Sequence, residues 1–335
     1  MSTNNFEKQT GRDKFFDQID GELKKITNPA TGEVYSNLTA AIDCPLCGVR
    51  KDEPLFTKQG FRFVRCQDCG IIYVNPQMLP GKLVDEYRED SAANRSWKDI
   101  LLSPAQVEFN NKNYGIILDV VERYQRKGRV LDIGCSFGHF LDLARRRGFT
   151  VEGMELENEA VKYARKELNL TIHQKVLVEA GFAGGEFDIA AALGVLEHVS
   201  DPLNFLKDIN RILKPEGVLV LTLPNVVSLV CMVLKEKARC FTGRNHLTYF
   251  SLPTLDKMLN KAGFKIVYQE SYVSGINSIT NELQSLNPFA DLEFKYLPAE
   301  FSGLLQDRNK KQQLEDLICR LGLGYKLRAV AKKIT

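Results

Sequence analysis

The sequence predicts an α/β protein with a mostly parallel sheet, an antiparallel last strand and a small cysteine-rich module near the N-terminus. Two observations predict this fold class. First, an apolar strand, a glycine turn, a helix and a second strand follow one another between residues 129 and 155, which is the order of a β-α-β unit. Second, two C-x-x-C-G pairs lie between residues 44 and 70, a pattern typical of a small zinc-binding module.

The composition is that of an ordinary folded chain of 335 residues, 44% hydrophobic and 26% charged. This length predicts one large domain with a smaller module, or two medium domains. The formal net charge of +3 excludes an acidic solvating chain and does not favour an obligate nucleic-acid binder. The sequence has no run of 18 apolar residues and no apolar signal core at its start. We therefore expect a cytoplasmic protein without a membrane span, an export signal or disulfides.

Four of the eight cysteines form two knuckles. Cys44 and Cys47 make the first pair, and Cys66 and Cys69 make the second, each followed by a glycine that can adopt a positive φ. The segment between the pairs predicts a β-hairpin that turns at residues 58–60. Four thiolates at this spacing can surround zinc tetrahedrally, and a complete shell leaves no position for a water molecule. The pattern predicts a structural zinc ribbon rather than a catalytic zinc. The remaining cysteines are scattered, and we interpret Cys231 and Cys319 as small hydrophobic residues in packed helices.

A candidate cofactor site begins at residue 129. The strand from Arg129 leads into the turn D-I-G-C-S-F-G, the next helix runs to residue 147, and a second strand ends at Glu155. An acid about 20 residues beyond a glycine turn is typical of adenosine-cofactor binding, because glycines let the backbone approach the ligand and the acid can bind ribose hydroxyls. Asp132 at the strand end would repel a pyrophosphate but suits an ammonium group. This favours S-adenosylmethionine over NAD.

Further motifs follow in order: F-D-I-A-A-A-L-G-V-L-E-H-V-S-D-P from residue 187, I-L-K-P-E-G-V-L-V-L-T-L-P-N from 212, H-L-T-Y-F-S from 246 and A-G-F from 262. With them, the sequence resembles the class I S-adenosylmethionine-dependent methyltransferases over about residues 44–274, with a last strand at 325–331. It is similar to the branch of the ubiquinone-type O-methyltransferases. Members of this branch with an N-terminal zinc ribbon include sugar C-methyltransferases that act on nucleotide-linked keto-sugars. The resemblance implies a Rossmann-like methyltransferase sheet.

The resemblance also implies roles for individual residues. The family pattern is D/E-x-G-x-G-x-G, in which Ser136 replaces the middle glycine. Asp132 would hold the cofactor ammonium group, Glu155 would accept hydrogen bonds from the ribose hydroxyls, and backbone after the fourth strand would contact the methionine end. The adenine has no clear acidic partner, so backbone at residues 176–177 is expected there. The predicted cofactor-binding set is Asp132, Gly134, Cys135, Ser136, Gly138, Glu155, Leu193 and Gly194.

His246 is the predicted general base, because it matches a histidine over the substrate pocket of related enzymes and because imidazole titrates near neutral pH. The alternative is a histidine that only forms a hydrogen bond within its loop. Tyr249 and Asn225 are expected to line the pocket beside it. Glu197 and His198 match the L-E-H motif of the family, and we interpret them as bracing their own turn by hydrogen bonds.

The chain is predicted to have four parts. Residues 1–40 form a polar, loosely ordered segment, 41–80 the zinc ribbon, 81–128 a helical connector with a helix over 106–126, and 129–335 the S-adenosylmethionine-binding methyltransferase domain. A helical insertion at 275–322 lies between the two last strands of that domain. The sequence leaves open whether the insertion caps the pocket, forms a subunit contact or faces solvent.

The predicted function is methyl transfer by direct displacement to a small molecule of a biosynthetic pathway, with C- or O-methylation of a nucleotide-linked sugar favoured. The alternative is an rRNA or tRNA methyltransferase that docks through the ribbon. Residues 41–80 hold five basic and four acidic side chains, a balance that gives no electrostatic footprint for RNA. A non-catalytic binding protein is a third possibility, against which the intact residues Asp132, Gly134 and Glu155 count. We expect no nucleic-acid or membrane partner, and a monomer or homodimer.

Overall fold

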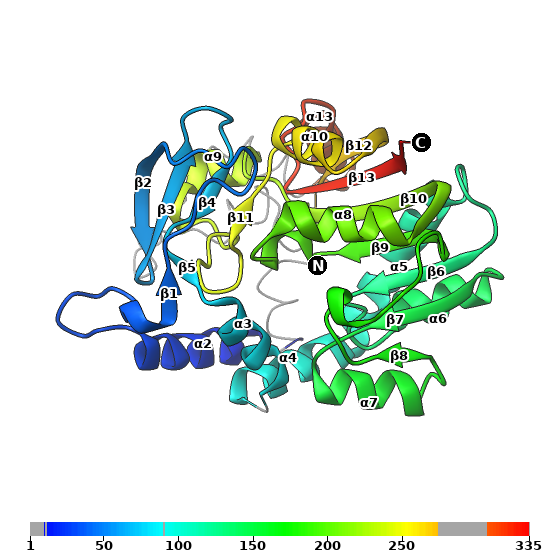
Figure 1. Ribbon diagram of the computed structural model, residues 1–335, viewed down its shortest axis with the longest axis horizontal. Helices are drawn as coiled ribbons and strands as arrows, with labels where there is room; N and C mark the ends of the chain where they lie inside the picture. Colours follow the sequence, from blue (N-terminus) through cyan, green and yellow to red (C-terminus); the bar gives the residue numbers. More distant parts are fainter. Residues whose placement is uncertain (1–9, 11, 90, 274–306, 335) are drawn as a thin grey trace.

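The computed structural model describes residues 10, 12–89, 91–273 and 307–334. Its main element is a seven-stranded sheet of order β12-β13-β10-β9-β6-β7-β8 (Figure 1). The strands from β8 to β10 run parallel, and β13 pairs antiparallel with both β10 and β12. This confirms the predicted fold class. The strands are β6 (Arg129–Ile133), β7 (Thr150–Met154), β8 (Ile172–His173), β9 (Phe187–Leu193), β10 (Leu213–Pro224), β12 (Phe264–Tyr272) and β13 (Lys326–Lys333).

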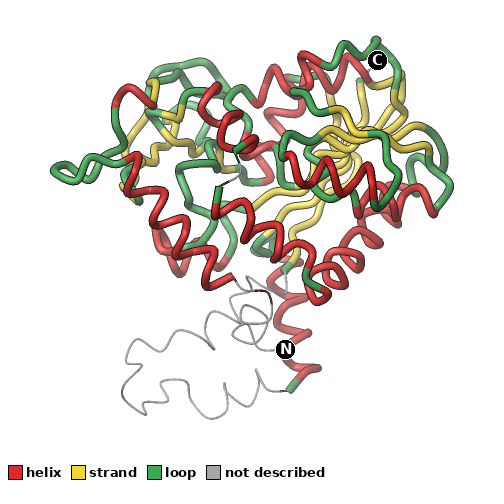
Figure 2. Tube along the Cα trace, turned by 90° about the horizontal axis from the view of Figure 1, so that it is seen from below, coloured by secondary structure: helices red, strands yellow, loops and turns green. Residues whose placement is uncertain are grey.

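Helices cover both faces of this sheet (Figures 1 and 2). Strand β10 explains why: Leu219 and Leu221 pack into one hydrophobic cluster and Val218 and Val220 into another, so both faces need cover. Helices α8 (Pro202–Ile212) and α10 (Leu252–Lys261) contribute to the first cluster. Helices α5 (Pro104–Val121), α6 (His139–Arg146) and α7 (Asn158–Lys166) contribute to the second.

A second, four-stranded sheet has the order β11-β4-β3-β2. Strands β2 (Asp52–Lys58) and β3 (Phe61–Cys66) form the predicted hairpin, and β4 (Ile72–Val74) follows the second cysteine knuckle. Strand β11 (Thr248–Tyr249) comes from the region predicted to be methyltransferase domain, and it pairs with β4. A segment distant in sequence thus completes the sheet of the ribbon. Residues on both sides of the boundary predicted after residue 80 belong to this one sheet.

The N-terminal segment differs from the loosely ordered stretch that we expected. Its described part forms α2 (Arg12–Ile26), followed by η1 (Ser36–Leu38) and the short strand β1 (Thr39–Ala40), which pairs with β5 (Gln77–Met78). Ile19, Leu23 and Ile26 lie on one stripe of α2 and join the hydrophobic cluster around the second sheet. Five apolar residues among the 15 of a polar helix are a weak signal, so the sequence did not predict this helix.

The remaining elements connect these layers. Helices α3 (Pro80–Arg88) and α4 (Ala92–Leu102) precede α5, and the short turns η2 (Leu177–Glu179) and η3 (Leu196–His198) flank β9. Helix α9 (Leu229–Leu234) and η4 (Lys235–Lys237) follow β10. Of the predicted insertion, residues 275–306 lie outside the described residues, and α13 (Arg308–Arg320) forms most of the rest. Among the described residues, the helices are all too short or too polar to cross a membrane.

Candidate functional site

Asp132 is a buried carboxylate, one oxygen of which has no partner among the described residues. It lies near the carboxyl end of β6 and is 2% exposed, and its Oδ1 accepts no hydrogen bond within the described part of the chain. Burial, with a smaller contribution from the Glu155 carboxylate, raises the pKa of Asp132 well above its usual range. An unsatisfied buried acceptor costs about 1–3 kcal/mol. The site therefore fits a ligand that brings a cationic hydrogen-bond donor, such as the ammonium group of S-adenosylmethionine.

The turn after β6 has left-handed backbone at three positions. Gly134, Ser136 and Gly138 have φ values of +74°, +49° and +80°. A Cβ atom on Gly134 would lie 2.7 Å from Val195 Cγ2, and one on Gly138 would lie 2.6 Å from Leu170 Cδ1. Close packing therefore requires both glycines. Ser136 carries a side chain in a conformation that favours glycine, which gives a physical reason for the glycine of the family pattern.

Cys135 belongs to the same turn, but its thiol points into the core. The residue is 6% exposed, and a Cβ atom added to Gly153 would lie 2.6 Å from Cys135 Sγ. Its backbone N–H donates to Met154 O at 2.9 Å. The predicted part of Cys135 in cofactor binding stays a prediction.

Glu155 closes the turn from the next strand. Its Oε2 accepts a hydrogen bond from the Ser136 N–H at 2.8 Å, and its Oε1 accepts from the N–H groups of Leu156 at 2.6 Å and Glu157 at 3.0 Å. A carboxylate has about four acceptor positions, so about one is left for a ligand hydroxyl. Burial raises the pKa of Glu155 despite these three donors. The residue fits a ribose hydroxyl and also holds the glycine turn in place.

The carboxyl ends of β9 and β10 adjoin this turn. Gly194 follows β9 with φ +73°, and its N–H donates to Thr222 O at 2.7 Å. Leu193 pairs with Thr222 in the parallel register of the two strands. The backbone at the predicted residues Leu193 and Gly194 therefore lies at the same edge of the sheet as the turn after β6, where ligands of open α/β sheets bind.

Beyond β9, three side chains gather that sequence reasoning did not bring together. Glu197 and His198 lie on η3, and each of Glu197, His198 and His246 offers a donor atom within 4.8 Å of the others. The rings of His198 and His246 meet edge to face with centroids 4.6 Å apart. Glu197 is 4% exposed, its Oε2 has no partner in the described part of the chain, and burial raises its pKa to about 7.

The contacts of Glu197 and His198 reach beyond their own turn. The backbone carbonyl of Glu197 accepts from the Leu247 N–H at 2.7 Å, which ties η3 to the segment of His246. His198 Nδ1 lies 2.9 Å from Tyr87 Oη of α3. Tyr87 carries no motif and comes from the predicted connector, so no sequence signal could identify this contact.

The protonation of His246 follows from its partner. Its Nδ1 lies 2.8 Å from the backbone carbonyl oxygen of Cys240, and because a carbonyl only accepts, Nδ1 carries the proton. Burial lowers the pKa of His246 to about 4, so the ring is neutral at neutral pH and Nε2 holds a lone pair. This is the tautomer that a general base requires.

The loop of His246 is anchored from two sides. Arg244 Nη1 lies 2.7 Å from Glu22 Oε2 of α2, and its Nε lies 3.1 Å from Glu86 Oε1 of α3. Tyr249 Oη donates to His246 O at 2.9 Å and accepts from the Gly243 N–H at 3.4 Å. Tyr249 is 3% exposed and positions the loop through these contacts, and its predicted part in the pocket stays a prediction.

Asn225 also has a bracing position. Its Nδ2 donates to Gly322 O and Gly324 O, both at 2.9 Å, and its Oδ1 accepts from the Val227 N–H at 3.3 Å. These contacts join the end of β10 to the segment before β13. The predicted part of Asn225 in substrate binding stays a prediction.

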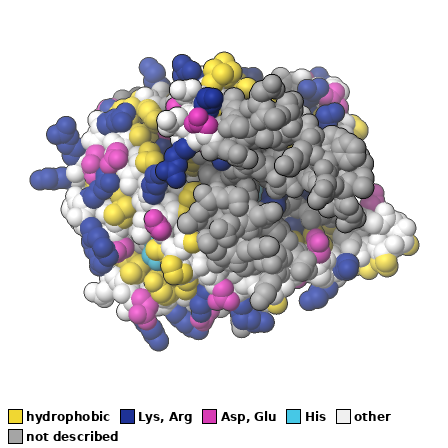
Figure 3. Space-filling view, turned by 180° about the vertical axis from the view of Figure 1, so that it is seen from behind, with side chains coloured by type: hydrophobic (Ala, Val, Ile, Leu, Met, Phe, Trp, Pro, Cys, Tyr) yellow, Lys and Arg dark blue, Asp and Glu magenta, His cyan; other side chains and the backbone are white. Residues whose placement is uncertain are grey.

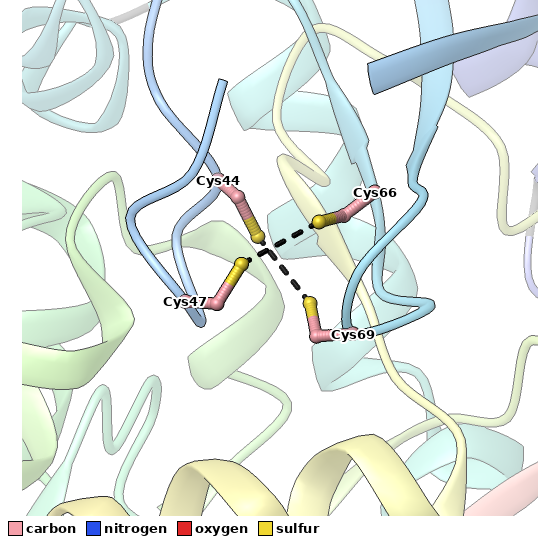
Figure 4. Close-up of side chains that lie close together, drawn as sticks. All are labelled: Cys44, Cys47, Cys66 and Cys69. Carbon is pink, nitrogen blue, oxygen red and sulfur yellow. Dashed lines mark hydrogen bonds between the residues drawn. The ribbon is translucent and has the colours of Figure 1, made fainter. Parts of the chain in front are cut away.

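The four ribbon cysteines point toward one another (Figure 4). The Sγ atoms of Cys44 and Cys69 are 3.5 Å apart, as are those of Cys47 and Cys66. Sulfur ligands about 2.3 Å from a tetrahedral zinc ion are about 3.8 Å apart, so a modest expansion would admit the ion. The four thiols thus fit zinc as a complete shell. Lys261 Nζ of α10 donates to Leu46 O at 2.9 Å and attaches the first knuckle to the main domain.

The part of the surface that Figure 3 colours by side-chain type carries both signs of charge. Lysine and arginine side chains project around its rim, and aspartate and glutamate side chains lie among them.

Comparisons with known proteins agree with this geometry. Residues 109–269 match a family model described as a methyltransferase domain. The ubiquinone biosynthesis O-methyltransferase of Actinobacillus pleuropneumoniae is 33% identical over 101 residues, which are 27% of this chain and 43% of that protein. The enzyme of the same name from Psychrobacter arcticus is 34% identical over 150 residues, 41% of this chain and 58% of that protein. The chain spans about half the length of these curated relatives.

A crystal structure of an S-adenosylmethionine-dependent methyltransferase from Archaeoglobus fulgidus aligns with a TM-score of 0.46 and 17% identity, covering 68% of this chain and 96% of that one. The range matched by the family model contains strands β6 to β10 and the turn after β6. By the family match, residues 109–269 form a methyltransferase domain.

Proposed function

We propose that this protein transfers a methyl group from S-adenosylmethionine to a small molecule of a biosynthetic pathway. The observation that carries the proposal is the buried Asp132 carboxylate, whose Oδ1 lacks a partner in the described part of a chain that matches a methyltransferase family. The names of the curated relatives support an oxygen atom as the acceptor. Within that class, the combination with a cysteine ribbon leads us to propose a nucleotide-linked sugar as substrate.

Residues of the turn after β6 would hold the cofactor. Asp132 would accept a hydrogen bond from its ammonium group, and the remaining acceptor position of Glu155 would take a ribose hydroxyl. Backbone at Leu193 and Gly194 would line the methionine end. When bound, S-adenosylmethionine supplies an electrophilic methyl group on a sulfonium ion. Fixing the acceptor in line with that group can supply roughly 7–11 kcal/mol of the barrier reduction.

His246 would take the proton from the acceptor. Its Nδ1 is committed to Cys240 O, so Nε2 is the atom available for proton transfer. Glu197, whose pKa burial raises to about 7, would receive the proton within the same cluster. His198, held by Tyr87, would keep the two groups at a fixed separation. A positioned base of this kind contributes about 10²–10⁴-fold to the rate.

The zinc ribbon would have a structural role in this reaction. Cys44, Cys47, Cys66 and Cys69 would hold the ion as a closed shell. The ribbon strand β4 pairs with β11, which begins two residues after His246, through the pairs Tyr73–Thr248 and Ile72–Tyr249. A folded ribbon therefore supports the loop that carries the proposed base.

Calorimetric titration with S-adenosylhomocysteine tests the proposal. The wild type should bind one equivalent, and Asp132→Asn should weaken binding about 10- to 100-fold, since the lost interaction of a charged pair is worth about 1.5–3 kcal/mol. Asp99→Asn, an exposed position on α4, is the matched control and should bind as the wild type does. Absence of saturable binding to the wild type would overturn the proposal.

A further inference from the structure

Cys231 and Cys240 form a buried pair of thiols outside the ribbon. Cys231 lies on α9 and Cys240 in the segment that leads to His246, and they are 5% and 2% exposed. Their Sγ atoms are 3.4 Å apart. The sequence suggested only a small hydrophobic residue in a helix at position 231, so the structure adds its partner. A disulfide requires a separation of about 2.05 Å, which a shift of about 1.3 Å would reach.

The pair is not arranged as a metal site. Among the described residues, the sets of three or more potential metal ligands are the ribbon cysteines and the cluster of Glu197, His198 and His246, and neither includes Cys231 or Cys240. Two sulfur ligands alone do not complete the coordination of zinc. The close approach of the two thiols is instead a hydrogen bond between them.

A basic side chain lies beside the thiols. Lys58 Nζ of β2 donates to Ala238 O at 3.0 Å, and its charge interacts with both cysteines and with Glu236. The hydrogen bond from Cys240, followed by one from Ser228 and by the Lys58 charge, lowers the pKa of Cys231. Cys240 keeps its proton, because this hydrogen bond and burial raise its pKa. One sulfur of the pair is thus prepared as the nucleophile for thiol–disulfide exchange.

The pair is directly connected to the proposed base. The backbone carbonyl of Cys240 is the group that accepts the hydrogen bond of His246 Nδ1 at 2.8 Å. The next residue, Phe241, packs against Tyr249 with ring centroids 5.1 Å apart. Moving Cys240 toward Cys231 would therefore displace the acceptor that fixes the tautomer and orientation of His246.

We propose that Cys231 and Cys240 are a redox-active dithiol whose oxidation alters the hydrogen bond that holds His246. The oxidant is a low-molecular-weight disulfide. The Cys231 thiolate attacks one of its sulfur atoms and releases one thiolate, and Cys240 then loses its proton and displaces the second. The products are the Cys231–Cys240 disulfide and two low-molecular-weight thiols, so two electrons pass from the protein to the oxidant. Slower methyl transfer by the oxidised form is a consequence that rests on the proposed function.

The first experiment detects the bond in the full, zinc-loaded chain. The protein is incubated with oxidised and reduced glutathione at increasing ratios, alkylated, and digested with trypsin without reduction. Lys235, Lys237 and Arg239 place the two cysteines in different peptides, so a bond between them appears as a cross-linked species. We expect it in the wild type and in Cys319→Ser, and not in Cys240→Ser. Its absence at the most oxidising ratio, while a denatured sample forms it, would overturn the proposal.

The second experiment tests whether oxidation of the two cysteines affects His246, and it needs no activity assay. Histidine ring signals are recorded by NMR in the reduced and oxidised protein, with His246 assigned by His246→Asn. We expect the His246 signal to shift on oxidation in the wild type and to stay in place in Cys240→Ser. A disulfide that leaves the His246 signal unchanged would overturn the coupling. Neither readout depends on methyl transfer, so failure of the proposed function would leave both results interpretable.

Discussion

His198 and His246 meet edge to face, with their ring planes at 89° and their centroids 4.6 Å apart. His198 reaches this position from the end of β9, and His246 precedes β11, the strand that joins the ribbon sheet. The contact therefore depends on both sheets. It places two imidazoles that stay neutral at neutral pH beside a carboxyl group whose pKa burial raises to about 7, so Glu197 is the member of this cluster that titrates near neutral pH.

The pH dependence of methyl transfer should show which group limits proton removal. Glu197 titrates at about 7 and His246 at about 4, so a rate that needs the Glu197 carboxylate should rise between pH 6 and 8 and level off above. Glu197→Gln should remove this rise and lower the constant rate above pH 8 about 10²-fold. The measurement is the initial rate of label transfer at each pH. If the rise in rate near pH 7 persists in Glu197→Gln, a group other than Glu197 causes that rise.

The same substitution should stabilise the fold at alkaline pH. The pKa of Glu197 is raised from 4.5 to about 7 in the folded state, so the unfolded state loses its proton first and stability falls as pH rises from about 4.5 to 7. Above pH 8 this cost is on the order of 3 kcal/mol. Urea unfolding should therefore show Glu197→Gln to be more stable than the wild type at pH 8 and equal to it below pH 4.5.

Glu179→Gln provides the matched control for that comparison, because Glu179 is exposed on η2. Its unfolding free energy should stay within about 0.5 kcal/mol of the wild type at both pH values. Equal stability of Glu197→Gln and wild type at pH 8 would contradict the raised pKa of this buried carboxyl group.

Asp132 should show opposite effects on stability and on binding. Burial raises its pKa, so the charged form destabilises the free protein, and Asp132→Asn should increase the melting temperature without ligand. The same variant should lose most of the increase in melting temperature that S-adenosylhomocysteine gives the wild type. Thermal unfolding with and without the ligand measures both effects. A variant that melts lower without ligand and keeps the full ligand response would show that Asp132 is structural.

Loss of one ribbon cysteine should remove the metal and disturb the proposed base. Metal analysis of wild type purified without added metal should find about one zinc per chain. Cys66→Ser should fall well below that and shift the His246 NMR signal, because β11 would lose the support of β4. Cys319→Ser, a substitution on α13, should leave the zinc content and the His246 signal unchanged. Two zinc ions per chain would instead place a metal among Glu197, His198 and His246, against their assignment to proton transfer.

Local patterns accounted for the parts of the site that are formed by neighbouring residues. The turn after β6 and the two cysteine knuckles each lie in a short stretch, so spacing alone indicates Asp132, Glu155 and the four thiols. Contacts between distant segments gave no such signal. Tyr87 reaches His198 from α3, and Arg244 joins Glu22 and Glu86 from two helices, through side chains that are common on any surface.

Tyr249 and Asn225 also show what a position at a strand end leaves open. Tyr249 at the end of β11 donates to the backbone of His246 in its own loop, and Asn225 after β10 donates to backbone groups of residues 322 and 324, which only the folded chain brings near it. Position along the chain indicates which residues reach an edge of a sheet. It does not indicate whether their polar atoms remain available to a ligand.

The most direct test of the central claim is a transfer assay with methyl-labelled S-adenosylmethionine and a cell extract separated by size. The wild type should place the label in the small-molecule fraction, and Asp132→Asn should reduce the transfer about 10- to 100-fold at subsaturating cofactor, in step with its weaker binding. Label in the nucleic-acid fraction would contradict a small-molecule substrate and assign the ribbon to RNA docking. No transfer to any fraction by a wild type that binds S-adenosylhomocysteine would contradict the proposed enzymatic activity itself.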